Sequence, residues 1–221
     1  MSRPPLRIVL ADDERMVRTA LRVILEAEPD LEVVGEAASG AEAVAQVRSL
    51  APDVVLMDVR MPEIDGIRAT EQILRTMERP PRIVVVTTFE NDAYVYDALR
   101  AGAAGFLLKR ADPDELIGAV RLVARGDSLL FPAAVRTLAA AHAATVPSAV
   151  PGWAGRLTER EADVLRLMAT GLSNHELSER LGVGAQTVKT HVASVLAKTG
   201  SRDRTQAVIA AYEGGFIMKK G

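Results

Sequence analysis

Apolar residues follow two different spacings in the first half of the chain. Short runs of β-branched and aliphatic residues predict buried strands, and apolar residues that recur every three or four positions predict helices. The predicted strands are 6–11, 31–37, 54–58, 83–89 and 105–109. One predicted helix begins at Arg15, and the other four are 41–50, 67–77, 92–102 and 113–126. Five strands that alternate with five helices indicate an α/β fold with a doubly wound, five-stranded parallel sheet.

Polar side chains stand at the ends of four of these strands. Asp12 and Asp13 follow the first strand, Asp58 ends the third, Thr87 the fourth and Lys109 the fifth. Ligands of such sheets bind at the carboxyl ends of the strands, which meet at one edge. A single aspartate there is an ordinary turn residue, but turns do not explain why four strands carry polar groups to the same edge. We therefore expect these five residues to form one site.

The composition of this predicted site indicates a particular chemistry. Three carboxylates repel one another unless a cation lies among them, and Mg²⁺ is a hard cation that accepts carboxylate oxygens. A carboxylate can also act as a nucleophile toward phosphorus and form an acyl phosphate. The ammonium group of Lys109 would neutralise phosphate charge, and the hydroxyl of Thr87 would donate a hydrogen bond to it. The sequence thus predicts Mg²⁺ as a cofactor.

The middle of the chain, residues 127–156, differs in composition from both sides. It is rich in alanine, nearly uncharged, and contains Pro147, Pro151 and Gly152. A short helix near 132–142 followed by a flexible linker fits this pattern. An ordered helix between two domains fits it as well.

The last third of the chain contains helix signals only. Thr158–Glu161 and Ser173–Glu176 are capping boxes, in which a hydroxyl and a glutamate each bond an exposed amide at a helix start. The predicted helices are 161–171, 175–182, 185–200 and a last one near 204–213. A short helix, a turn with glycine and a longer basic helix form a helix-turn-helix pattern. We expect a small all-α domain.

Composition and charge exclude several classes of protein. The chain has no cysteine, so disulfides and thiol chemistry are excluded, and no apolar run of about 18 residues predicts a membrane span. The N-terminal apolar run is too short for a signal peptide, and we expect a soluble cytoplasmic protein. Residues 1–125 carry 16 basic and 21 acidic side chains, whereas residues 156–221 carry 10 basic and 7 acidic ones. The net charge of +3 in the last third suits a partner with negative charge.

The first half resembles the receiver domain of two-component response regulators over about residues 6–125. The resemblance rests on DD at 12–13, MDVRMPEIDG around Asp58, TT at 87–88 and Lys109. It implies a flavodoxin-like fold and a phosphoryl group that Asp58 accepts from a histidine kinase. It also implies that Asp13 and Asp58 bind Mg²⁺ directly, that Asp12 acts through water, and that the carbonyl of Arg60 completes the metal site.

The same resemblance implies how such a site signals. Thr87 would move toward the phosphate, and the backbone of Thr88 would bind it. Phe106 stands where the family has Tyr or Phe, and would rotate inward behind Thr87.

The stretch GLSNHELSERLGVGAQTVKTHVASVLAKTGSRDRTQAV resembles the LuxR-type helix-turn-helix of the NarL/FixJ class of response regulators. It implies that the helix at 185–200 enters the major groove of DNA. The candidate DNA-binding residues are Gln186, Thr187, Lys189, Thr190, His191, Arg202 and Arg204. For His191 a structural role is an open alternative. Arg202 and Arg204 either contact the DNA backbone or form salt bridges such as one with Asp203.

A monomer with so few basic contacts is expected to bind DNA weakly, whereas a dimer on a two-fold site doubles its phosphate contacts. The last helix offers Val208, Ile209 and Tyr212 as a candidate dimer surface. Packing of these residues within their own domain is an equal alternative.

These observations predict a transcription regulator that is switched by phosphorylation and is not an enzyme. The expected domains are a receiver at 1–126, a linker at 127–156 and a DNA-binding domain at 157–221. The expected partners are a cognate histidine kinase, double-stranded promoter DNA and, after phosphorylation, a second copy of the chain, with no membrane.

Three rival functions remain to be compared with this one. An aspartate-nucleophile phosphohydrolase is expected to show a DxD pattern after its first strand, whereas Asp12 and Asp13 are adjacent. A dimeric DNA-binding regulator that does not depend on phosphorylation has no use for the full acidic set with Lys109. A protein-binding C-terminal domain does not explain the basic shift or the TVKTHV motif.

Overall fold

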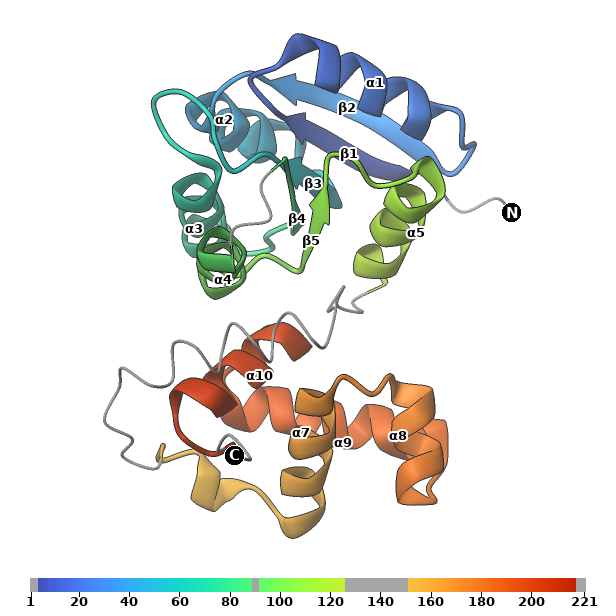
Figure 1. The fold of residues 1–221 in the computed structure, drawn as a ribbon, viewed down its shortest axis with the longest axis vertical. Helices are drawn as coiled ribbons and strands as arrows, with labels where there is room; N and C mark the ends of the chain where they lie inside the picture. The colour runs from blue at the N-terminus through green and yellow to red at the C-terminus, as the bar shows by residue number, and fades with distance from the viewer. Residues whose placement is uncertain (1–3, 89–91, 126–150, 218–221) are drawn as a thin grey trace. The chain divides into compact units, whose positions relative to one another are not determined.

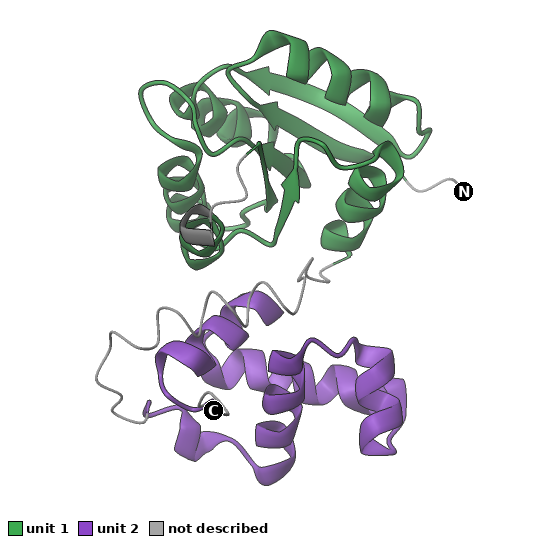
Figure 2. Ribbon diagram, viewed as in Figure 1, with its two compact units in different colours: residues 1–129 green, residues 130–221 purple. Residues whose placement is uncertain are grey.

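The computed structural model describes residues 4–88, 92–125 and 151–217. The chain divides into two compact units, residues 1–129 and residues 130–221, which Figure 2 shows in two colours. The first unit is a parallel sheet between layers of helices, and the described part of the second unit is helical (Figure 1). The predicted fold class is confirmed for both.

The sheet of the first unit has five parallel strands in the order β2-β1-β3-β4-β5. Its strands are β1 (Leu6–Ala11), β2 (Leu31–Ala37), β3 (Val54–Met57), β4 (Arg82–Thr87) and β5 (Gly105–Leu108). The first two match the predicted bounds. The third and the fifth each end one residue earlier than predicted, so Asp58 and Lys109 lie just beyond the ends of their strands.

Helices cover both faces of this sheet (Figure 1). They are α1 (Arg15–Glu26), α2 (Gly40–Leu50), α3 (Gly66–Thr76), α4 (Asp92–Ala101) and α5 (Pro113–Ala124). Successive strand residues alternate between two cores: Ile8 and Leu10 pack with residues of α1 and α5, whereas Val9 and Ala11 pack with α2 and α3. Because both faces are buried, these strands are apolar throughout instead of alternating with polar residues.

The described part of the second unit contains a 3₁₀ turn, η1 (Ala154–Arg156), and the helices α7 (Glu159–Thr170), α8 (Asn174–Leu181), α9 (Ala185–Thr199) and α10 (Arg204–Glu213). Both predicted capping boxes are present, with Thr158 before α7 and Ser173 before α8. Gly182 ends α8 in the left-handed conformation, with φ of 63°, and so turns the chain into α9. The helix predicted near 132–142 lies outside the described residues. No helix among the described residues has the length and apolar character of a membrane span.

Candidate functional site

Hydrogen bonds that continue the sheet beyond its strands place the predicted site residues at one edge. The amide of Asp58 donates to the carbonyl of Ala11 at the end of β1, over 2.7 Å. The amide of Lys109 donates to the carbonyl of Thr87 at the end of β4, over 2.9 Å, and the amide of Asp12 donates to the end of β2, over 3.1 Å. Each residue is therefore held by the strand next to its own.

Three carboxylates meet at this edge. Asp12, Asp13 and Asp58 each offer an oxygen, and these atoms all lie within 4.8 Å of one another. Asp12 and Asp58 are buried, whereas Asp13 is exposed. The ammonium nitrogen of Lys109 lies 2.7 Å from Oδ2 of Asp12 and 3.4 Å from Oδ2 of Asp58. The structure thus brings together the acidic set and the lysine that the sequence predicts.

Burial and charge act in opposite directions on this cluster. Burial raises the pKa of Asp58 to about 6, even though the charge of Lys109 opposes the shift. Burial alone lowers the pKa of Lys109, but its hydrogen bond to Asp12 and the charge of Asp58 outweigh that effect and raise the pKa above its ordinary value. The lysine is therefore a stable cation beside a carboxylate whose negative charge is incompletely compensated.

This donor set fits a small divalent cation. The three carboxylate oxygens are hard ligands gathered within 4.8 Å, and they carry more negative charge than Lys109 neutralises. Mg²⁺ accepts one or two carboxylates in such sites and keeps several of its waters. Asp13, the exposed member, gives the cluster its opening to solvent. The side chain of Arg60, two residues after Asp58, is exposed as well.

The residues of the predicted switch lie on or directly after β4 and on β5, the last two strands on one side of the sheet. Thr87 is buried at the end of β4, and Thr88 is exposed directly after it. Phe106 on β5 is half-buried and packs against a cluster that contains Val59 and Val85. Since Val59 follows Asp58, the ring of Phe106 contacts the same small core as the segment that carries this carboxylate.

The helix α9 of the second unit has a buried side and an exposed side. Val188 and Val195, two turns apart, are fully buried. The predicted DNA-binding residues Gln186, Thr187, Lys189 and Thr190 are all exposed, whereas His191 is half-buried. The side chain of Lys189 forms no ion pair with any described residue, and a cation on the first two turns of an exposed helix face suits a phosphate or base contact.

Known proteins match the whole of this architecture. The family model of the response regulator receiver domain matches residues 8–121, and that of bacterial regulatory proteins of the luxR family matches residues 155–211. The transcriptional regulatory protein LiaR of Bacillus subtilis is 39% identical over 212 residues, which cover 96% of this chain and 99% of LiaR. The chain belongs to the two-component response regulators.

Two further relatives agree with this assignment. The response regulator protein VraR of Staphylococcus aureus is 37% identical over 216 residues, covering 96% of this chain and 99% of VraR. The crystal structure of the response regulator ChrA, from a heme-sensing two-component system, is 32% identical, covers 97% of this chain and 100% of its own, and has a TM-score of 0.53. The response regulator thus combines a receiver with a LuxR-type DNA-binding domain, as predicted, and its relatives are transcriptional regulators.

Two arginines of this response regulator bind the ends of helices in the DNA-binding domain. Arg156 donates to a carbonyl at the end of α9, over 2.8 Å, and Arg160 to one at the end of α8, over 2.6 Å. The last carbonyls of a helix have no partner inside the helix and carry partial negative charge, so cations stabilise them. These two guanidinium groups therefore stabilise the ends of α9 and α8.

Arg204 has contacts that the sequence did not predict. Its guanidinium donates to the carbonyl of Leu172 and to Oδ1 of Asn174 (3.4 Å), and the side chain is half-buried. These bonds hold the turn between α7 and α8, a role that neither of the two predicted alternatives included. Arg202 is exposed, as a DNA contact requires. Asp203 caps α10 by accepting a bond from the amide of Gln206.

The three residues of the candidate dimer surface are buried. Val208, Ile209 and Tyr212 are 2%, 4% and 8% exposed. Side chains with so little free surface cannot form an interface unless the helix that carries them moves. The structure therefore agrees with the alternative interpretation, in which these residues belong to the core around α10.

Two residues that the sequence did not indicate belong to the receiver site. The amide of Glu14 donates to Oδ1 of Asp12 (2.9 Å), and its carboxylate lies 3.4 Å from the ammonium of Lys109. Gly66 donates its amide to Val59 (2.9 Å) and lies so close to Asp58 that a Cβ atom would stand 1.8 Å from the Asp58 carbonyl oxygen. Glu14 extends the acidic run at 12–13, and Gly66 ends the MDVRMPEIDG motif, but neither pattern specifies these contacts.

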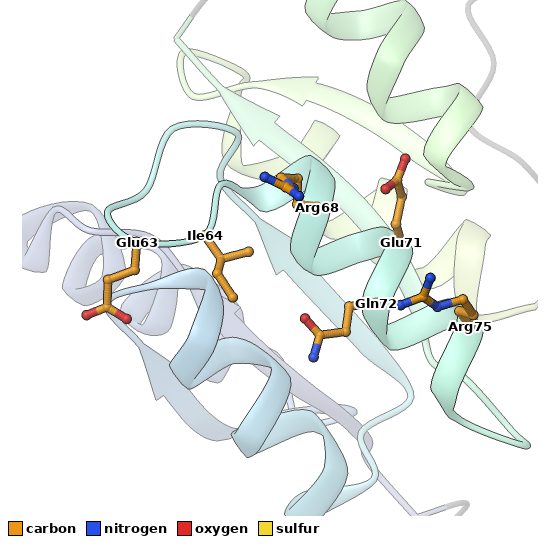
Figure 3. Close-up of a pocket in the computed structure, with 6 residues that line it drawn as sticks. All are labelled: Glu63, Ile64, Arg68, Glu71, Gln72 and Arg75. Atoms are coloured by element: carbon orange, nitrogen blue, oxygen red, sulfur yellow. The ribbon is translucent and has the colours of Figure 1, made fainter.

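A separate hollow of about 590 Å³ lies beside α3 in the receiver (Figure 3). Its polar lining alternates in charge, with Arg68, Glu71 and Arg75 on the helix and Glu63 in the loop before it. None of the predicted site residues lines this hollow. Its balanced charges distinguish it from the acidic edge of the sheet.

A buried glutamate connects the scaffold of the DNA-binding domain to α9. Glu161, near the start of α7, accepts hydrogen bonds from the hydroxyl of Ser194 and the ammonium of Lys198, both over 2.5 Å, and from the amide of Thr158 over 2.7 Å. The bonds from Lys198 and Ser194 lower the pKa of Glu161 to about 2. The ionised glutamate thus holds α9 against α7.

Replacing Glu161 by glutamine should lower the free energy of unfolding of the DNA-binding domain by roughly 2 kcal/mol at neutral pH. Since the folded-state pKa is lowered from 4.5 to about 2, the ionised glutamate stabilises the fold above pH 4.5, and this contribution is lost as the pH falls toward 2. The variant should therefore lose stability less steeply than wild type over that window. Urea unfolding followed by the fluorescence of Trp153, the single tryptophan, measures this.

Glu159→Gln is the matched control, because Glu159 is exposed in the same turn of α7. Equal pH profiles of Glu161→Gln and wild type between pH 4.5 and 2 would contradict the role of Glu161.

Proposed function

We propose that Asp58 is the phosphoacceptor of this response regulator, and that its phosphorylation by a histidine kinase raises the affinity of the chain for promoter DNA. The observation that supports this is the convergence of Asp12, Asp13, Asp58 and Lys109 at one edge of the sheet. A carboxylate oxygen of Asp58 bonds to phosphorus while the bond from phosphorus to the kinase histidine breaks, which leaves an acyl phosphate. Lys109 neutralises charge on the phosphoryl group.

The same proposal includes a metal ion. Asp13, Asp58 and the carbonyl of Arg60 hold Mg²⁺, and Asp12 acts through water. When bound, Mg²⁺ supplies charge neutralisation and a Lewis acid for a phosphate oxygen. Removal of divalent ions with EDTA is therefore expected to stop phosphorylation.

The conformational switch starts from the charge that the phosphoryl group adds, roughly −1.5 to −2. The Thr87 hydroxyl and the Thr88 amide bind the phosphate, and Phe106 rotates behind Thr87. The support for this step is the half-buried ring of Phe106 against the core that includes Val59 and Val85. A partly packed ring against the core that contains Val59 can change position at a small cost in buried area.

The output is binding of double-stranded promoter DNA by two phosphorylated copies. Gln186, Thr187, Lys189 and Thr190 enter the major groove, and Arg202 contacts phosphate; exposure of all five supports this. The receiver is residues 1–126, the DNA-binding domain 157–221, and the linker 127–156. The protein acts in the cytoplasm, where promoter DNA is found, without a membrane partner and without turnover of a separate substrate.

Selection of bound sequences from random duplex DNA tests this function. The full chain is used with and without beryllofluoride plus Mg²⁺, a stable mimic of the phosphoryl group, beside Asp58→Ala. We expect a two-fold symmetric motif that is enriched only in the activated wild type. Lys189→Ala should weaken binding of that motif and reduce the slope of log affinity against log salt by about 1 per subunit, and hence by about 2 for the two bound copies. Arg166→Ala is the control, because Arg166 pairs with Asp163 on α7 and its loss should leave this slope unchanged.

The other outcomes separate the rival functions. Equal enrichment with and without beryllofluoride would agree with DNA binding but contradict the phosphorylation switch. It would support a dimeric regulator that is independent of phosphorylation. Absence of enrichment in both states, together with binding of protein rather than DNA, would favour a protein-binding C-terminal domain. Steady release of phosphate from small phosphomonoesters, lost in Asp58→Ala, would favour the phosphohydrolase.

A further inference from the structure

One arginine outside the acidic cluster contacts the backbone that carries two of its carboxylates. Arg18 lies on the first turns of α1, and its side chain is only 13% exposed. Its Nη1 donates to the carbonyl of Asp12 over 2.6 Å and lies 3.4 Å from the carbonyl of Asp13, while its Nε donates to Glu36 on β2 over 3.1 Å. One guanidinium therefore joins the turn after β1 to the neighbouring strand.

We infer that Arg18 is a positioning residue of the magnesium site, which fixes the backbone on both sides of Asp13 and thereby the direction of its carboxylate. This inference rests on the proposed function of the acidic cluster. The peptide planes that contain the Asp12 and Asp13 carbonyls are the two planes that flank the Cα of Asp13. Because each peptide is planar, holding both carbonyls holds φ and ψ of Asp13.

Asp13 depends on this contact more than Asp12 does. Asp12 is also held by its amide bond to β2, by the Glu14 amide on Oδ1 and by Lys109 on Oδ2. Asp13 is exposed, and its carbonyl receives the long bond from Arg18. Without Arg18, the peptide plane between Asp12 and Asp13 loses its 2.6 Å bond and can rotate, whereas the plane between Asp13 and Glu14 keeps the bond from the Glu14 amide to Oδ1 of Asp12.

The anchor of Arg18 is itself well defined. Glu36 accepts bonds from Nε of Arg18 and from Nε of Arg22, the latter over 2.7 Å. The bond from Arg22, followed by that from Arg18, lowers the pKa of Glu36, so the carboxylate is ionised at neutral pH. This charge compensates that of Arg18, which limits the repulsion between the guanidinium and a divalent cation nearby. Position should therefore outweigh charge in the effect of Arg18 on the ion.

Arg22 provides a matched control. It lies one turn further along α1 and bonds the same Glu36, together with Glu26. Arg22 has no bond to the carbonyls of Asp12 or Asp13, whereas Arg18 bonds both. Arg22→Ala removes the same charge from the same helix and leaves the metal turn in place.

The experiment measures Mn²⁺ binding to the full, unphosphorylated chain by electron paramagnetic resonance, followed by displacement with Mg²⁺. Arg18→Ala should weaken binding of both ions about tenfold, since partners that orient metal ligands typically contribute tenfold or more to affinity. Arg22→Ala should stay within about twofold of wild type. With acetyl phosphate as donor, the Mg²⁺ concentration for half-maximal phosphorylation of Arg18→Ala should rise by about the same tenfold factor, while the rate at saturating Mg²⁺ changes little.

Arg18→Lys separates position from charge, and it replaces Arg18→Ala if that variant does not fold. Lysine keeps the charge but has no planar fork that bonds Glu36 and the carbonyls together, so binding should stay weakened. Full recovery in Arg18→Lys, tighter binding in Arg18→Ala, or equal loss in Arg18→Ala and Arg22→Ala would each overturn the inference. If the wild type itself binds neither Mn²⁺ nor Mg²⁺, the result contradicts the proposed magnesium site, and the inference on Arg18 falls with it.

Discussion

Asp58→Asn is expected to abolish phosphorylation of the response regulator by acetyl phosphate. The amide has nearly the shape of the carboxylate and can still accept the bond from the Val59 amide, which is 2.8 Å long in the wild type. An amide is not a nucleophile toward phosphorus at neutral pH, so no acyl phosphate forms. Incorporation of labelled phosphoryl groups into the full chain measures this effect. The beryllofluoride-dependent gain in DNA affinity should disappear in the same variant.

Asp53→Asn is the control at the opposite end of β3. Asp53 is exposed, and its carboxylate accepts a bond from the Arg7 amide over 2.8 Å, which asparagine can also accept. Its phosphorylation should equal that of wild type. Labelling that persists in Asp58→Asn would identify another acceptor and refute the assignment of Asp58.

A stability measurement adds a second readout for the same variant. Burial raises the pKa of Asp58 from 3.8 to about 6, so the folded state disfavours the ionised carboxylate. The charge therefore lowers stability increasingly as the pH rises from 3.8 toward 6, and fully above it. Asp58→Asn removes that charge and is expected to unfold at higher urea than wild type in Mg²⁺-free buffer at neutral pH. A lower midpoint would show that the ion pair with Lys109 outweighs burial.

Gly66→Ala is expected to destabilise the receiver by at least about 3 kcal/mol. The added Cβ would stand 1.8 Å from the carbonyl oxygen of Asp58 and 3.0 Å from the side chain of Met57. The obstacle is backbone at the end of β3, which cannot move without displacing Asp58. Urea unfolding followed by far-ultraviolet circular dichroism measures the loss. At low urea, the variant should also accept phosphoryl groups from acetyl phosphate more slowly than wild type.

Gly118→Ala is the control for this substitution. Gly118 is exposed in α5, and no atom lies within 4 Å of the Cβ that alanine would add. Alanine in an exposed helix interior is more favourable than glycine, so this variant should gain about 0.5–1 kcal/mol. Equal stability of Gly66→Ala and wild type would mean that the turn after β3 adapts, contrary to our expectation.

The sequence by itself predicted the elements and the edge that carries the chemistry. The apolar runs located the strands, because strands that are buried on both faces must be apolar throughout. Asp12, Asp58, Thr87 and Lys109 could be assigned to one site since parallel strands bring their carboxyl ends to one edge. The capping boxes at Thr158 and Ser173 could be identified from the sequence because both partners of each box lie within four residues.

Only the tertiary structure decided which contacts orient these residues. The bonds from Arg18 to the metal turn, the approach of Gly66 to Asp58 and the support of the α7–α8 turn by Arg204 join elements that are separate in the chain. A local pattern has no signal for such pairs, because a surface arginine and one that bonds a distant carbonyl have the same neighbours in sequence. The burial of Tyr212 has the same cause: an apolar stripe predicts a covered face, and only the fold determines what covers it.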